Sequence, residues 1–184
     1  MILPVCVYGH PVLRKVATEI TPDYPNLNQL IENMFETMGK ADGIGLAAPQ
    51  IGLSIRLIVI DARAAASDEK PDLADFKKVF INPQIIEYKA DEWTYNEGCL
   101  SLPEIREDVD RPAVVRVRYQ NENFDFFEEE FDGMKARIIQ HEYDHIEGKL
   151  FIDRINPIRR RLLSSKLKQI SKGKVIPVYK IKTA

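Results

Sequence analysis

The chain has 184 residues, of which 45% are hydrophobic and 29% are charged. This length and balance are typical of a single globular domain over 1–184, and they exclude a fibrous or disordered chain. No stretch approaches the roughly 20 apolar residues that span a bilayer, and residues 1–8 lack the pattern of a signal peptide. The two cysteines, Cys6 and Cys99, are too few for a disulfide framework, so we expect a cytoplasmic protein without membrane contact.

The net charge of −2 is unevenly distributed along the chain. Residues 154–184 contain ten of the 26 Lys and Arg and no acidic residue, which leaves 16 basic against 28 acidic residues elsewhere. A basic segment on an acidic body indicates either a polyanionic partner or a solvated helix face. Charge alone leaves both interpretations open.

In the first half of the chain, apolar residues at helical spacing predict an amphipathic helix over 26–40. A glycine-rich, apolar loop follows over 43–50. The β-branched run at 56–61 predicts a strand, and the polar stretch 62–78 is typical of a surface loop. Three further strands are expected, at 79–88, 113–119 and 124–131.

The second half predicts two helices and a final strand. The first helix is expected over 133–147, with Asp132 as its cap and Gly148 at its end. The second is expected over 157–171, with proline in its first turn, and a final strand is expected over 175–181. This mixture predicts an α+β fold in which antiparallel strands predominate.

The segment 141–145, His-Glu-Tyr-Asp-His, is the strongest functional signal. Residues four apart lie on one helix face, so both imidazoles can reach one ion. Met134 and Ile138 continue this stripe, which is expected to face the core. Glu142 lies about 100° around the helix from His141, where a general base for a metal-bound water belongs. A chance occurrence on a surface helix is the alternative.

A catalytic site of the zinc type needs three protein ligands and one open position. His10 is the only other histidine, and we expect it to be structural or solvated, which leaves a cysteine or a carboxylate. Cys99 follows Gly98 in the short segment 97–101, which we expect to be a loop, and glycine permits close approach of the backbone. Cys6 lies in an apolar segment and is expected to be packed. We prefer Cys99, with a buried, metal-free thiol as its alternative.

Residues 43–50, 97–101 and 141–145 together resemble the three signature motifs of bacterial peptide deformylases, in order and at sensible separations. The resemblance covers about residues 3–170. It implies an α+β fold with antiparallel β-sheets packed around a central metal-binding α-helix, and we expect a C-terminal helix and a short tail strand to complete the chain. The implied ligands of one divalent ion are Cys99, His141 and His145.

The resemblance also implies the reaction. Family members remove the formyl group from the N-terminal formyl-methionine of nascent polypeptides and release formate. Water on the ion, expected to be Fe²⁺ with Zn²⁺, Ni²⁺ or Co²⁺ as substitutes, attacks the formyl carbon while Glu142 acts as general acid and base. The Gln50 amide and the Leu100 backbone N–H are the implied oxyanion donors, and Gln50 has a loop-stabilising role as its alternative.

The implied substrate lies as an extended strand beside the loop at 43–50, with a thioether pocket walled by the helix that carries the histidines. The charge on Arg137 suits the rim of that pocket better than its floor. Arg106 is a candidate for holding a substrate carbonyl. The expected substrate-binding residues are Ile44, Gly45, Gly98, Arg106, Met134, Arg137 and Ile138.

Two other functions compete with this interpretation. A zinc endopeptidase would use the same helix with a different third ligand, such as Asp153. A structural zinc or nucleic-acid-binding module would close the site with a fourth ligand, for which Cys6 and His10 are available. For the basic segment 154–184, a ribosome contact is expected by resemblance, and no DNA partner is expected.

Overall fold

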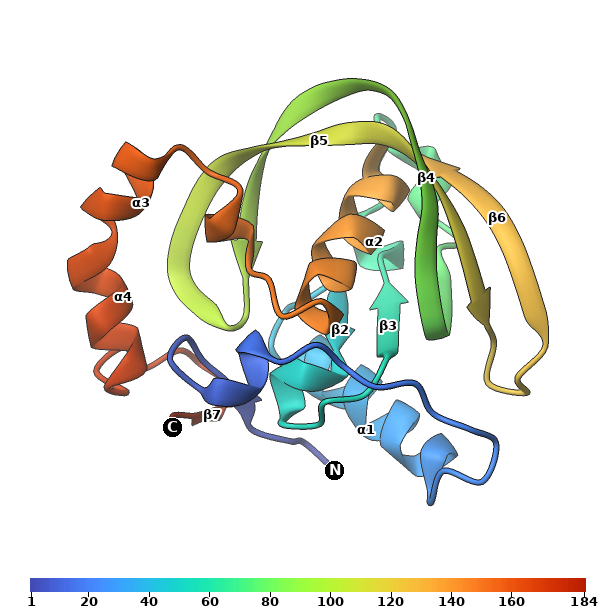
Figure 1. Cartoon of the computed structure of the whole chain (residues 1–184), viewed down its shortest axis with the longest axis horizontal. Coiled ribbons are helices and arrows are strands. Elements are labelled where there is room, and N and C mark those ends of the chain that lie inside the picture. Colours follow the sequence, from blue (N-terminus) through green and yellow to red (C-terminus); the bar gives the residue numbers. More distant parts are fainter.

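The computed structural model describes residues 1–184, and in it one helix lies beneath an arch of two long, curved strands (Figure 1). The helix is α2 (Gly133–Ile146), and the arch is formed by β4 (Lys77–Cys99) and β5 (Leu102–Gln120). These strands belong to a five-stranded antiparallel sheet of order β2-β3-β4-β5-β6. Its other strands are β2 (Gly45–Ala47), β3 (Leu57–Asp61) and β6 (Phe126–Asp132). The predicted α+β fold around a central helix is confirmed.

The remaining elements surround this unit. Figure 1 places α1 (Leu27–Lys40) near the N-terminus and the C-terminal helices to one side of the arch. A second sheet has only two short strands, β1 (Val5–Cys6) and β7 (Ile181–Lys182), which pair in parallel. No helix has both the length and the apolar character that crossing a bilayer requires.

The two arch strands are much longer than the predicted strands 79–88 and 113–119. Their pairing continues through register shifts, one of them between Lys89 and Glu92, and Ala90 adopts a left-handed φ of 60°. Such bulges bend a strand and interrupt the alternation of polar and apolar residues by which it is recognised. The sequence therefore indicates only the regular part of each strand.

Two segments expected to be loops are ordered into the core. The glycine-rich segment forms β2, antiparallel to β3, and then a 3₁₀ turn over Ala48–Ile51. In the stretch 62–78, expected to be a surface loop, Leu73 and Phe76 are buried in the main core. Hydrophobic side chains in both segments find buried neighbours, which outweighs the weak local preference for strand or helix.

Near the C-terminus the predicted helix over 157–171 is two helices. α3 (Pro157–Leu162) and α4 (Ser164–Ser171) are separated at Leu163, directly before two serines, which disfavour helix interiors. The strand predicted over 175–181 is also wrong in extent, because only β7 finds a partner strand. Asp132 does occupy the N-cap position of α2, but its side chain makes no capping hydrogen bond.

Three large hydrophobic clusters form the core, and the first of them holds α2 against the sheet. One fills the space between α2 and the sheet, where the rings of Phe80 and Tyr119 lie 4.5 Å apart. A second packs α1 against β2 and β3, and a third joins β5 to α4 and includes Phe151 and Leu167. Packing of this density leaves α2 little freedom to shift, so side chains on it are held in fixed positions.

Candidate active site

Three side chains from two distant parts of the chain meet under the arch. Cys99 is the last residue of β4, which corrects its expected place in a loop, and His141 and His145 lie one turn apart on α2. The Cys99 Sγ is 3.3 Å from Nε2 of His145, and one potential ligand atom from each residue lies within 4.8 Å of the others. Thiolate and imidazole suit divalent transition metals. The structure brings the predicted ligands together, and ligation itself stays a prediction.

The neighbours of Cys99 favour the thiolate form of its side chain. Burial raises its pKa, but the charges of His145 and His141 and their hydrogen bonds outweigh burial and lower the pKa of Cys99 to about 5. The thiolate is the form that binds metals. The local electrostatics therefore favour the reactive form of the side chain at neutral pH.

Glu97 orients the first histidine. Its Oε2 lies 2.8 Å from Nδ1 of His141, which leaves Nε2 of that ring free for a metal. Burial raises the pKa of Glu97, but hydrogen bonds from His141 and Arg111 lower it well below its usual value. A carboxylate behind a ligating imidazole fixes the orientation and tautomer of the ring. Glu97 was not among the predicted site residues, although its position two before Cys99 on a strand places it on the same face.

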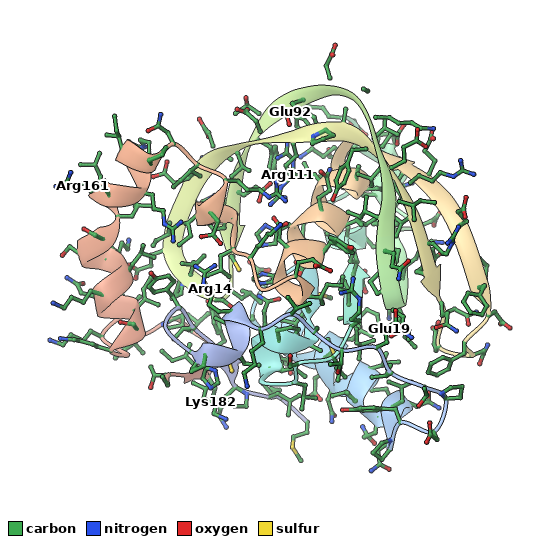
Figure 2. All side chains as sticks on the ribbon, in the orientation of Figure 1. Arg14, Glu19, Glu92, Arg111, Arg161 and Lys182 are labelled. Atoms are coloured by element: carbon green, nitrogen blue, oxygen red, sulfur yellow. The ribbon has the colours of Figure 1, made fainter.

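A buried arginine joins Glu97 to α2. The side chain of Arg111, on β5, is fully buried beneath the arch (Figure 2). Its Nε lies 2.7 Å from Oε1 of Glu97 and its Nη1 lies 2.8 Å from Oδ2 of Asp144, which also pairs with Arg154. Sequence reasoning missed Arg111 because no local pattern reveals which strand will pass over α2. The network compensates each buried charge with an opposite one.

Glu142 lies beside the three candidate ligands. It is buried, its Oε2 has no hydrogen-bond partner, and burial raises its pKa. Gly45 on β2 faces it so closely that a Cβ there would lie 2.5 Å from Oε1 of the carboxylate. A buried carboxylate oxygen without a partner carries a free-energy cost unless a group enters the site to bind it. The donor set and this acceptor together fit a metal with a bound water.

Gln50 and Leu100 lie next to the cluster of Cys99, His141 and His145. Oε1 of Gln50 accepts a hydrogen bond from the Ala47 N–H at 2.9 Å, and its Nε2 lies 3.6 Å from the Cys99 Sγ. The amide therefore stabilises its own loop while it presents N–H groups to the cluster, so the two interpretations of Gln50 are compatible. Leu100 follows Cys99 in the turn between β4 and β5 and lines the adjoining cavity.

A cavity of about 470 Å³ opens beside the cluster. Cys99, His141, Glu142, Gln50 and Leu100 line it, so the candidate chemistry faces a space that suits a peptide end. Every predicted substrate-binding residue also lines this cavity, namely Ile44, Gly45, Gly98, Arg106, Met134, Arg137 and Ile138. Their contacts with substrate stay a prediction.

The two arginines that line the cavity, Arg106 and Arg137, are hydrogen-bonded to other residues of the chain. Arg137 is 2% exposed, and its Nη1 lies 2.9 Å from both Glu97 Oε1 and the Val109 carbonyl oxygen. Its expected place at the rim is therefore wrong, because the ion pair with Glu97 offsets the cost of burying the charge. Arg106 donates hydrogen bonds to the side chain and the carbonyl oxygen of Asn96 across the β4–β5 hairpin.

The residues required by the competing functions lie elsewhere. Asp153 pairs with Arg14 and Arg160, outside the Cys/His/His cluster. Cys6 is packed in a small apolar cluster, and the Nδ1 of His10 accepts a hydrogen bond from the Val12 N–H. The cluster therefore has neither an aspartate as third ligand nor a fourth soft ligand that would close it.

Comparison with known proteins decides the family. Residues 2–161 match the sequence model of the polypeptide deformylase family. The chain belongs to the peptide deformylase family. It is a metal-dependent hydrolase of the class that removes the N-terminal formyl group from nascent polypeptides.

Relatives match most or all of this deformylase. A peptide deformylase of Flavobacterium johnsoniae is 53% identical, over 100% of this chain and 97% of its own length. The crystal structure of the Thermotoga maritima deformylase is 42% identical and superimposes with a TM-score of 0.76, covering 85% of this chain and 99% of the other. An Acinetobacter baumannii deformylase with bound Met-Ala-Ser is 36% identical, with a TM-score of 0.77, and covers 84% and 99%.

We predict that Glu97→Gln weakens metal binding by about 10- to 100-fold. The substitution replaces the carboxylate that accepts a hydrogen bond from the His141 ring with a neutral amide, so the ring is oriented less strongly and loses the negative charge beside it. Competition with a chromogenic chelator measures the metal affinity. Glu107→Gln is the matched control, since Glu107 faces Glu97 across the hairpin and is also buried but pairs with Arg159 instead. Equal affinities of Glu97→Gln and wild type would contradict the prediction.

Proposed function

We propose that this deformylase releases formate from formyl-methionyl peptides in the cavity beside Cys99, with Cys99, His141 and His145 holding one divalent ion. The observation that carries the proposal is the buried, unpartnered carboxylate of Glu142 directly beside the cysteine and the histidines. The bound Met-Ala-Ser of the Acinetobacter baumannii relative, which has the sequence of a deformylated peptide, supports a peptide in the corresponding cleft.

The side chains have distinct roles in this proposal. A divalent ion held by Cys99, His141 and His145 would supply a Lewis acid, which would lower the pKa of a bound water and polarise the formyl carbonyl. Glu142, whose pKa is raised by burial, takes a proton from the attacking water and later donates it to the leaving amine. The Gln50 amide and the Leu100 N–H donate hydrogen bonds to the oxygen that gains negative charge.

The cavity walls position the peptide. The backbone of Ile44 and Gly45 is proposed to bind the substrate as an added strand, with Gly98 opposite. Met134 and Ile138, on the turns of α2 before His141, provide apolar surface for the methionine side chain. These buried side chains favour an apolar thioether over a charged residue at this position.

We predict that Glu142→Gln lowers kcat for formyl-Met-Ala-Ser by at least about 10²-fold, because an amide cannot accept and return the proton. Formate release measures the rate, and metal analysis accompanies it. Metal content is expected to stay at the wild-type level, because Glu142 is not one of the proposed ligands.

Two variants frame this test. Glu147, the C-cap residue of α2, pairs with Arg56, and Glu147→Gln is expected to keep wild-type activity. Cys99→Ala is expected to lose the metal and the activity together. Full formate release by Glu142→Gln would refute the acid–base role, and metal retained by Cys99→Ala would favour the endopeptidase ligand set.

We also propose Fe²⁺ as the working metal, which the family resemblance implies. Zn²⁺, Ni²⁺ or Co²⁺ are proposed as substitutes, since one thiolate and two imidazoles accept all four ions. The thiolate donates more charge than a third imidazole, which lowers the Lewis acidity that zinc would provide. Ferrous iron beside a thiolate is also open to oxidation.

For enzyme purified under argon, we predict a shorter activity half-life in air than under argon. The difference follows from oxidation of ferrous iron and its thiolate ligand, and it should disappear when the protein is loaded with Ni²⁺. Residual formate release over time measures both half-lives. Equal half-lives of the freshly purified enzyme in the two atmospheres would count against iron.

The basic segment is only partly free to bind a partner. Four of its cations pair with carboxylates of the body, through Arg154–Asp144, Arg159–Glu107, Arg160–Asp153 and Lys166–Glu104. Arg161, Lys168 and Lys172 are exposed, and Figure 2 shows Arg161 on the outer side of α3. We propose that this face contacts ribosomal RNA in the cytoplasm and that the protein has no membrane or DNA partner.

Binding to ribosomes is therefore predicted to weaken steeply with salt, because bound phosphates release counterions. Replacing Lys168 and Lys172 by Gln should reduce the slope of log affinity against log salt by about 2, measured by co-sedimentation. Lys40→Gln on α1 is the control, since Lys40 is exposed but distant in sequence from this segment. Ribosome binding that does not depend on salt, or no ribosome binding, would refute the proposed contact with ribosomal RNA.

A further inference from the structure

The segment 175–182 lies beside the active-site cavity, beyond the residues that match the family model. Its exposure alternates: Ile176 is 86% and Val178 97% exposed, whereas Pro177 and Tyr179 line the cavity that holds Cys99 and Glu142. The segment 175–182, which follows α4, thus forms part of the wall of the active-site cavity.

This segment is held at both ends. Val175 is buried in the cluster that joins β5 to α4, and Ile181 packs against the same cluster. The backbone of β1 adds hydrogen bonds, from the Val5 N–H to the Lys180 carbonyl at 2.9 Å and from the Val7 N–H to the Lys182 carbonyl at 3.0 Å. The position of Tyr179 between these anchors is therefore defined by the fold rather than by its own contact alone.

Tyr179 contacts the turn that follows the candidate metal ligand. Its hydroxyl donates a hydrogen bond to the carbonyl oxygen of Leu100 at 2.8 Å. On the other side, a Cβ at Gly43 would lie 3.0 Å from Cδ1 of Leu100, so Leu100 is enclosed between the loop at residue 43 and Tyr179. The loop at Gly43 confines the Leu100 side chain, whereas the Tyr179 hydroxyl restrains the Leu100 backbone at its carbonyl oxygen.

We infer that Tyr179 is a positioning residue for deformylation: its hydroxyl holds the Leu100 backbone so that the Leu100 N–H points at the developing oxyanion. The inference rests on the proposed role of that N–H. An oxyanion donor acts through preorganisation, because a donor that must reorient during the reaction loses much of its effect. Tyr179 is not expected to touch the reacting atoms itself.

The test is Tyr179→Phe, which keeps the ring in the cavity wall and removes only the hydroxyl. We expect kcat for formyl-Met-Ala-Ser to fall about tenfold, less than the loss of a whole oxyanion donor, while KM changes by less than about twofold. Metal content is expected to stay at the wild-type level. Amide hydrogen exchange by NMR should be faster at Leu100 and Ser101.

Two variants serve as controls. Val178→Ala changes the same segment at a side chain that faces solvent, and Tyr24→Phe removes a hydroxyl near the α1 cluster. Both are expected to keep wild-type kcat and KM. An unchanged kcat in Tyr179→Phe would overturn the inference, as would a fall explained by lost metal or a rise in KM alone. Absence of formate release by wild-type protein would instead refute the proposed function.

Discussion

The site depends on a set of charges that are buried together beneath the arch. Glu97 holds the His141 ring and two arginines, and Arg111 joins it to Asp144 on α2. Removal of one partner would leave an uncompensated charge in a low dielectric, at a typical cost of about 3–5 kcal/mol. These ion pairs connect β4, β5 and α2, so the orientation of the His141 ring depends on all three elements.

Curvature of the sheet is the second constraint. Bulges bend β4 and β5 over α2, and the hairpin that they form returns Cys99 to within 3.3 Å of the His145 ring. On the other side, β2 approaches so closely that a Cβ at Gly45 would lie 2.5 Å from the Glu142 carboxylate. Long-range pairing of strands, rather than any local signal, places the cysteine, the carboxylate and the cavity around one point.

Much of the site could be predicted because its strongest part is local. His141, Glu142 and His145 lie within one and a half turns of a single helix, so helical geometry alone brings them to adjoining positions. Cys99 followed from the need for a third ligand and from the resemblance of its segment to a known family. Arg137 was assigned to the rim and is buried, because its partner Glu97 lies on a distant strand.

The sequence by itself determined the helices that carry an amphipathic pattern, the His-Glu-Tyr-Asp-His pentapeptide and the regular portions of the strands, since these follow from interactions between residues close in the chain. Only the tertiary structure decided the length of β4 and β5, the burial of Arg111 and the contact of Tyr179 with Leu100. Those features join residues tens of positions apart. Their energies depend on burial and pairing, which arise only when the chain has folded.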